Sequence, residues 1–325
     1  MKHLRALVCI GGAILLGLGI AEGVAEAGAA KYPTKPIEMV VAFPAGGGQD
    51  ATFRILAKYA EKHVGTRIVV LNKVGGGGVI GNTDIARSKP DGYTLGTISN
   101  NQVTDELTVK GVPYTYKDFV PVAQIAADPH VLVVKNALGM DFKQFIEHVR
   151  KNPNKVAMSM GGTWTSHDFF RVKLEKAYGV KFLRMSYQGG APALQAVAGG
   201  HVDSATPFIV EAMPSIEGKL VTSVAVSCAE RAPTLPNVPS VKELGQDVTQ
   251  YNFRGVSVPP GTPQEIIDFL EDAFAKAYKD PEFQSDLKKV GIFPFFRGHK
   301  DFVKYYQEEA ARYAAIAKEL AIEPK

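Results

Sequence analysis

Strand-like and helix-like segments alternate near the start of the chain, and this alternation constrains the fold more than any other feature. Short apolar runs predict strands at 37–43, 67–71 and 93–98. Apolar residues recur at helical spacing from Thr52 and again from Ile80. Strands and helices that alternate within so few residues predict a parallel sheet with helices on its faces. A ligand of such a sheet binds at the carboxyl ends of the strands, so the loops there are the candidate site.

The loop after the first strand has the composition of an anion site. Pro44 closes the strand, and Gly46, Gly47 and Gly48 let the backbone turn tightly and approach a small molecule. The helix that follows begins with amides that lack a carbonyl partner, and its dipole places about half a positive charge there. Strand, glycine turn and helix N-terminus together predict a bound anion. The alternative is a plain turn in which Asp50 caps the helix.

Length and composition narrow the class of protein. A chain of 325 residues suggests about two domains. With 46% hydrophobic and 22% charged residues it has the balance of a soluble globular protein. The net charge of +4 and the absence of a Lys/Arg run argue against a nucleic-acid partner. The seven histidines form no close pairs and have no cysteines nearby, so we expect no metal site.

The N-terminus predicts export. Basic residues precede the apolar run 6–20, and Ala25-Glu26-Ala27 forms an A-x-A cleavage site. We therefore expect a signal peptide at 1–27, with Ala27-Gly28-Ala29 as an alternative site. No later stretch of the sequence is long and apolar enough to span a bilayer.

The rest of the chain predicts a second lobe joined to the first by two crossings. Apolar strands on either side of Asp128-Pro129 mark the first crossing, and the strand expected at 221–226 is interpreted as the return. Two crossings predict a two-stranded hinge. The predicted division is a signal peptide at 1–27, one lobe from 28–125 plus 224–325, and a second lobe at 126–223.

Two stretches of the sequence resemble a catalytic motif or a cofactor motif. Ala157 to Gly161 imitates a nucleophile elbow around Ser159, with His167 close by, which leaves a secreted serine hydrolase as an alternative function. In that fold, however, the acid and the histidine lie far downstream, and Asp168 follows Thr165 in a helix-capping pattern. No Gly-Lys-Ser/Thr follows the run Gly75 to Gly78, so we expect no nucleotide cofactor.

Four motifs in order carry a resemblance to a known family. They are 42–50, then 72–81 with 90–95, then 186–194 with 199–203, and finally Gly255-Val256 with 259–263. The chain resembles the periplasmic substrate-binding proteins of tripartite tricarboxylate transporters, the Bug family, from about Tyr32 to Pro294.

This resemblance implies an α/β protein of the type II periplasmic-binding-protein fold, with two lobes, a two-stranded hinge and a central cleft. It implies a periplasmic, non-catalytic receptor without cofactor or metal, expected to be a monomer. Such a receptor captures a small carboxylate through backbone amides and hydroxyls and delivers it to the membrane components of the transporter. The alternative within this class is a carboxylate receptor that feeds a sensor kinase.

Carrying the family motifs over gives a set of ligand-binding residues. Gln49 departs from the usual Thr or Ser, and Trp164 falls at or beside a small hydroxylated position. We expect Asp50 to fix the glycine loop, and the Trp164 ring to wall the pocket opposite Phe43 rather than pack against Phe169 or Phe170. No arginine lies in the matching loops, so no arginine is expected to be obligatory. The predicted set is Phe43, Gly46, Gly47, Gly48, Gln49, Asp50, Gly76, Ser99, Asn100, Thr163, Trp164, Ser166, His167, Tyr187, Gly189 and Thr206.

Overall fold

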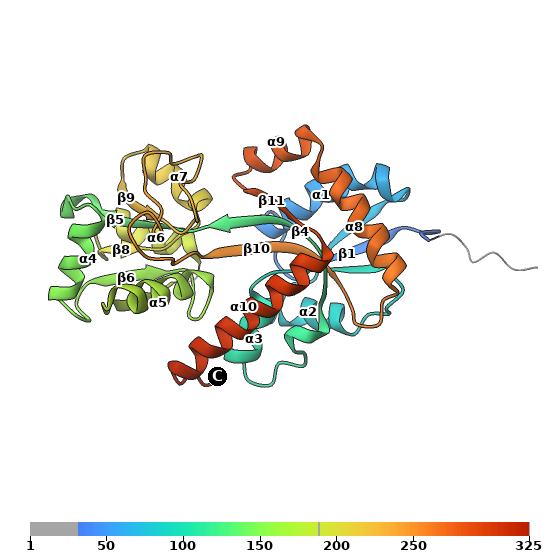
Figure 1. Ribbon diagram of the computed structural model, residues 1–325, viewed down its shortest axis with the longest axis horizontal. Coiled ribbons are helices and arrows are strands. Elements are labelled where there is room, and N and C mark those ends of the chain that lie inside the picture. Colours follow the sequence, from blue (N-terminus) through green and yellow to red (C-terminus); the bar gives the residue numbers. More distant parts are fainter. Residues whose placement is uncertain (1–31, 188, 325) are drawn as a thin grey trace, which may run out of the picture. The chain divides into compact units, whose positions relative to one another are not determined.

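Two mixed β-sheets organise the chain in the computed structural model, which describes residues 32–187 and 189–324 (Figure 1). Both sheets belong to one unit, Pro33–Lys325. The predicted signal peptide lies outside the described residues. Among those described, no helix has the length and apolar character needed to cross a membrane.

The first sheet contains the three strands that the sequence predicts as parallel. Its strand order is β11-β4-β10-β3-β1-β2. β1 pairs in parallel with both β2 and β3, which confirms that prediction, whereas β10 runs antiparallel to β3 and β4. The six strands are β1 (Ile37–Val41), β2 (Ile68–Asn72), β3 (Thr94–Ile98), β4 (Val120–Pro129), β10 (Tyr251–Val258) and β11 (Pro294–Arg297).

Helices cover both sides of the first sheet. α1 packs against α8 and α9 on one side, and α3 packs against α10 on the other side together with α2 (Figure 1). Fully buried Val40, Phe253 and Phe302 belong to the core under α10. These helices are α1 (Gly48–Val64), α2 (Val79–Ala86), α3 (Asn101–Thr108), α8 (Gln264–Tyr278), α9 (Pro281–Lys289) and α10 (His299–Glu319).

The second sheet is also covered on both faces. Its order is β7-β6-β8-β5-β9. One core unites the sheet with α4 and α5, and another unites it with α6 and α7. The strands are β5 (Val131–Lys135), β6 (Ala157–Met160), β7 (Leu183–Ser186), β8 (Ser204–Ala205) and β9 (Val221–Val226). The helices are α4 (Phe142–Lys151), α5 (Ser166–Tyr178), α6 (Gly190–Ala198) and α7 (Ile209–Glu217). Three short 3-10 helices lie at Gly76–Gly78, Tyr116–Asp118 and Asn136–Leu138.

The chain passes between the sheets twice, but not where the sequence places the return. The first passage follows the end of β4 at Pro129 and leads into β5. The strand at 221–226 does not return to the first sheet, because β9 pairs with β5 in the second sheet, with Val226 opposite Val131. The return is made by β10 instead. An apolar run of this kind suits either sheet, and the pairing with β5 decides between them.

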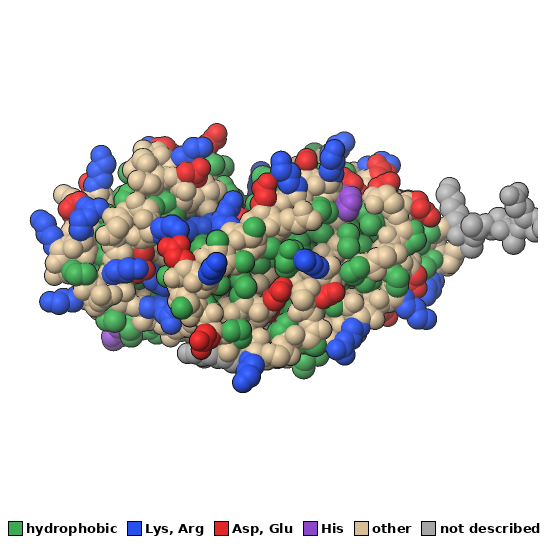
Figure 2. All heavy atoms as spheres, turned by 60° about the horizontal axis from the view of Figure 1, so that its bottom comes forward, with side chains coloured by type: hydrophobic (Ala, Val, Ile, Leu, Met, Phe, Trp, Pro, Cys, Tyr) green, Lys and Arg blue, Asp and Glu red, His purple; other side chains and the backbone are tan. Residues whose placement is uncertain are grey.

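Figure 2 shows one face of the molecule, on which several Lys and Arg side chains lie together in a hollow near the middle of the view, with acidic side chains beside them. Elsewhere on this face the basic side chains stand apart from one another. Among the described residues, no group of three or more His, Cys, Asp or Glu side chains is placed to hold a metal ion.

Candidate functional site

The predicted glycine loop lines a cavity of about 690 Å³. Its lining comes from both sheets and their helices, since the first strand's loop meets residues from the starts of α5 and α7 and from β10. The lining residues are Phe43, Pro44, Gly46, Gly47, Gly48, Gln49, Ala51, Asn101, Gly161, Thr165, Ser166, His167, Phe208, Val210, Glu211, Asn252, Arg254, Val290 and Ile292.

Three helices begin at this cavity. Residues of the first turn, or the cap before it, line it at α1, α5 and α7: Gly48, Ser166 and Val210 are examples. The first amides of each helix have no carbonyl partner within the helix, and each dipole adds a partial positive charge. Three such ends around one cavity favour a small anion.

A second cavity, of about 750 Å³, has the opposite helix polarity. It is lined by the carboxyl-terminal halves of α5 and α10, for example Ala177 and Glu319. Its charged side chains are engaged locally, because Arg312 pairs with Glu309 and Lys173 Nζ donates to the Thr249 carbonyl at 2.9 Å. Helix carboxyl ends disfavour an anion, so the glycine-loop cavity is the better candidate.

Asp50 fixes the glycine loop, as the sequence predicts. Its carboxylate accepts from the Gly46 amide at 2.9 Å, from Arg54 Nε at 3.0 Å and from Asn72 Nδ2 at 2.9 Å. Burial alone would raise the pKa of the Asp50 carboxyl, but the hydrogen bonds from Arg54, Gly46 and Asn72 outweigh it and hold the pKa below its ordinary value. The ionised carboxylate therefore stands behind the loop, turned toward its supports.

Arg254 supplies a guanidinium to a site for which the sequence predicts no arginine. It is only 6% exposed, and its Nε donates to Asp128 Oδ2 at 2.6 Å. The guanidinium also lies against the glycine loop, because a Cβ added at Gly48 would be 2.7 Å from Nη2 and 2.9 Å from Nη1. A side chain at position 48 would have to displace the guanidinium. The prediction of a site without an arginine is therefore corrected: Arg254 lines the cavity from β10.

His167 and Glu211 form a hydrogen-bonded pair in the second lobe's wall. His167 Nε2 lies 3.2 Å from Glu211 Oε2, so the imidazole donates to the carboxylate. The Phe208 amide donates to the same oxygen at 3.0 Å. Glu211 thus takes part in the cap of α7 while lining the cavity.

Ser166 is held by a chain of hydrogen bonds to the first lobe. His130 Nδ1 lies 3.0 Å from the Thr206 carbonyl and must donate, so its Nε2 accepts from the Ser166 hydroxyl at 2.8 Å. Burial, with the neighbouring His167 as the second cause, holds the pKa of His130 well below its ordinary value. Gln250 Nε2 donates to Ser166 Oγ at 3.1 Å and to Tyr313 Oη at 2.9 Å. The hydroxyl is consequently engaged before any ligand arrives.

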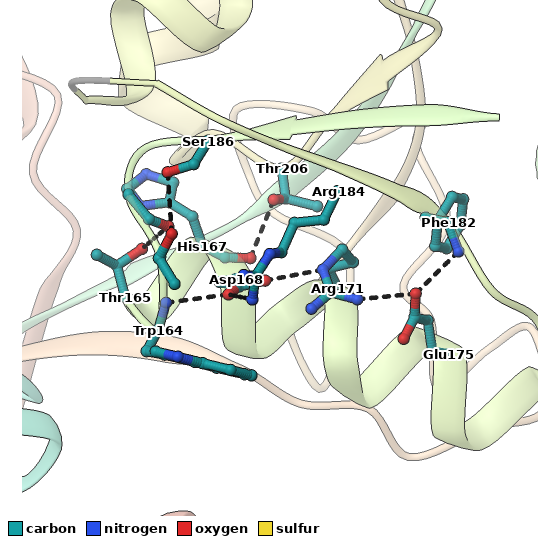
Figure 3. A network of polar contacts seen from close by, with 12 residues as sticks. Trp164, Thr165, His167, Asp168, Arg171, Glu175, Phe182, Arg184, Ser186 and Thr206 are labelled. Carbon is teal, nitrogen blue, oxygen red and sulfur yellow. Dashed lines mark hydrogen bonds and ion pairs between the residues drawn. The ribbon is translucent and has the colours of Figure 1, made fainter. Parts of the chain in front are cut away.

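Trp164 does not wall the cavity, which corrects the prediction made for it. Its ring packs against Phe169 with centroids 6.2 Å apart, and the Arg184 guanidinium lies 4.9 Å from its centroid. Its φ of 58° is unusual for a side chain other than glycine, and its amide donates to Asp168 Oδ2 at 3.0 Å. Figure 3 shows the ring turned away from the cluster around Asp168. This turn packs the partly buried ring against the core beside α5.

Asp168 is the centre of that cluster. It is fully buried and accepts from Arg171 Nε at 2.8 Å, while Arg171 also pairs with Glu175 at 2.8 Å (Figure 3). Glu175 in turn accepts from the Phe182 amide at 2.8 Å. These contacts fix the first turns of α5 and the strand that follows, so Asp168 has a structural role.

The other predicted residues fall into two groups. Phe43, Gly46, Gly47, Gly48, Gln49, Ser166 and His167 line the cavity. The remainder lie outside its lining, and they are Asp50, Gly76, Ser99, Asn100, Thr163, Trp164, Tyr187, Gly189 and Thr206.

Hydrogen bonds are formed by three residues of this second group. Thr206 Oγ1 donates to the His167 carbonyl at 3.0 Å, and Asn100 Nδ2 donates to Tyr313 Oη at 2.7 Å. Thr163 Oγ1 reaches Ser186 Oγ at 3.2 Å. Gln49 is tied at its Oε1 by the Thr97 hydroxyl at 2.9 Å, so its departure from a small hydroxylated residue anchors α1 to β3.

Ser159 is not placed as a nucleophile. It is fully buried in β6, and its Oγ lies 2.8 Å from the Ala193 carbonyl and 3.1 Å from the Ser204 carbonyl. A hydroxyl with these neighbours donates to a carbonyl. His167, the expected base, is hydrogen-bonded to Glu211 instead. The arrangement lacks the contact between nucleophile and base that acyl transfer requires.

Arg254 and Glu211 line the cavity but are not among the residues predicted from the sequence, and only Arg254 has a recognisable signal there. Arg254 interrupts the apolar strand 253–258, and a charge in a buried strand is rare unless it is paired. Glu211 lies in a helix that was not predicted, because Pro214 sits inside it.

Two α/β lobes with a cleft at helix N-termini define a solute-binding protein of the type II periplasmic-binding-protein class. The family model described as tripartite tricarboxylate transporter family receptor matches residues 52–322, and the chain belongs to this family. A curated relative, a UPF0065 protein in the gbd 5' region of Cupriavidus necator, is 30% identical over 94% of this chain and 93% of its own length.

Solved structures of similar proteins share the fold. A TctC solute-binding protein from Polaromonas has a TM-score of 0.80 at 28% identity, over 89% of this chain and 99% of its own. An R. palustris protein solved with adipate has a TM-score of 0.76 at 26% identity, over 90% of this chain and 100% of its own. MatC from Rhodopseudomonas palustris, with bound malate, has a TM-score of 0.71 at 26% identity, over 87% and 98%. This family consists of receptors, not enzymes.

Proposed function

We propose that this receptor binds a small carboxylate in the glycine-loop cavity. The observation that carries the proposal is the guanidinium of Arg254 lying against Gly48, where α1 begins. A carboxylate there would accept from the first amides of α1 and from Arg254. Hydrogen bonds to charged groups contribute about 1.5–3 kcal/mol each, which is enough to hold such a ligand. The relatives solved with adipate and malate support the same ligand class.

The proposed contacts differ in role. Gly48, with the amides that follow it in the first turn of α1, and Arg254 hold the carboxylate, and Phe43 supplies apolar contact. Gly46 and Gly47 form the turn before α1, and their own amides donate to Asp50 and to the Pro44 carbonyl. Ser166 and His167 line the cavity from the second lobe and would contact the ligand from that side. Asp50 and Thr206 keep these groups in place through their hydrogen bonds to the Gly46 amide and the His167 carbonyl.

The chain passes from one lobe to the other at two places, and these two connections are the proposed hinge. One lobe comprises residues 33–129 and 251–325, and the other begins at 130 and ends before 251. Ligand bound between the lobes would draw them together, as in other hinged binding proteins. The residues 1–27 would direct export and be removed, the mature monomer would act in the periplasm, and its partner would be the membrane part of a tripartite transporter.

A thermal-shift screen tests the ligand class. Mono-, di- and tricarboxylates are compared with the matching primary amides, which keep size and hydrogen bonding but lose the charge. A carboxylate at 100 times its Kd stabilises the folded state by about 2.7 kcal/mol. Stabilisation by a carboxylate and not by its amide is expected. Equal stabilisation by both would contradict the proposal.

A further inference from the structure

Helix α7 contributes a carboxylate, that of Glu211, to the wall of the cavity. Glu211 lines the cavity, and its side chain is 27% exposed. The Glu211 carboxylate packs directly against Gly190, because a Cβ added at Gly190 would lie 2.0 Å from Oε2 and 2.6 Å from Oε1. Gly190 is the first residue of α6, so the carboxylate of Glu211 occupies the region beside the amino end of that helix.

The two hydrogen bonds that hold Glu211 go to the same oxygen. The Phe208 amide and His167 Nε2 both donate to Oε2. Among the described residues, no hydrogen bond is made to Oε1. A ligand in the cavity can therefore meet a carboxylate oxygen that still accepts a hydrogen bond.

The charges of the cavity are consequently divided between its walls. Arg254 lies against Gly48 at the start of α1, whereas Glu211 lies against Gly190 at the start of α6. A ligand carboxylate suits the first wall. A second ligand carboxylate at α6 would meet the like charge of Glu211, and like charges brought together in a binding site are strongly disfavoured. A protonated amine there would complement it.

Resting on the proposed function, we propose that the ligand is an aminocarboxylate, with its carboxylate at the glycine loop and its protonated amine at Glu211. A simple dicarboxylate is disfavoured. Glu211 is the residue that determines this specificity, and His167 positions its carboxylate.

The test compares ligands of equal length in titration calorimetry. Each ω-amino acid is paired with the diacid and the monoacid of the same chain length: 4-aminobutanoate with succinate and butanoate, 5-aminopentanoate with glutarate and pentanoate, and 6-aminohexanoate with adipate and hexanoate. Because the series varies length, it does not depend on knowing the separation of the two charges. At the length that binds best, the amino acid is expected to bind at least about tenfold more tightly than either partner, as one favourable charge contact would give.

Two variants assign the preference to a residue. Glu211→Gln keeps an acceptor for the Phe208 amide but removes the charge, and should abolish the preference for the amino acid. Glu217→Gln removes an exposed carboxylate from the same helix and should preserve it. Tighter binding of the diacid by the wild-type protein would overturn the inference without needing any variant, and so would a preference unchanged in Glu211→Gln. Binding of diacids and monoacids without amino-acid preference would leave the proposed function standing, whereas binding of no carboxylate would overturn both.

Discussion

Arg254 Nε donates to Asp128 Oδ2 at 2.6 Å, and this pair joins β10 to β4. Both strands lie where the chain passes between the two sheets. Asp128 is fully buried and Arg254 nearly so, and the guanidinium also lies against Gly48. One buried pair thus connects the hinge region to the loop that would hold the ligand.

Arg254→Lys should weaken carboxylate binding at least about tenfold, and it should lower the free energy of unfolding by about 1–3 kcal/mol. Lysine keeps the charge, but its ammonium cannot form the planar fork that serves Asp128 and the loop together. Calorimetry gives the affinity, and urea denaturation gives the stability. Arg87→Lys, an exposed change on another helix end, is the control. Unchanged affinity in Arg254→Lys would show that the guanidinium does not contact the ligand.

Asp50→Asn should lower stability by about 1–2 kcal/mol at pH 7, and it should weaken ligand binding severalfold because the loop loses its support. The pKa of Asp50 is depressed in the folded state, so its contribution is fully present above the ordinary pKa. That contribution is lost as the pH falls through the folded-state pKa, below about pH 4. Denaturation at several pH values should show the two proteins converging there. A variant that binds the anion much more tightly would indicate instead that Asp50 faces the ligand.

Trp164→Phe should leave ligand affinity within about twofold of the wild type, since a surface or core change away from a site seldom alters binding by more. The ring packs against Phe169 and beneath Arg184, outside the cavity lining. Phe43→Ala is the matched comparison, because that ring does line the cavity, and it should weaken binding more. Loss of affinity in Trp164→Phe with Phe43→Ala unaffected would restore the earlier expectation for Trp164.

Strands and helices could be predicted from the sequence where neighbouring residues alone carry the pattern. The first parallel strands and the glycine-started helix α1 follow from apolar runs and from the turn that glycine permits. α3 was missed because its sequence is polar, and α7 because Pro214 interrupts it. β11 is a short edge strand whose sequence alone did not stand out.

The candidate site was predictable on the side built from consecutive residues. Gly46 to Gly48 and their support by Asp50 lie within one short loop. Arg254 reaches that loop from a distant part of the sequence, so only the packing of the sheet brings the two together. Trp164 was misplaced because its position along the chain says nothing of the positive φ that turns its ring toward Phe169.

The central claim is that a carboxylate is bound through its negative charge at Gly48 and Arg254. Calorimetric titration with the best acid from the screen, and with its methyl ester, measures this directly. The acid should bind and the ester should lose at least about a hundredfold in affinity, since the charge-assisted hydrogen bonds it forfeits are each worth about 1.5–3 kcal/mol. Equal affinity for acid and ester would contradict the account.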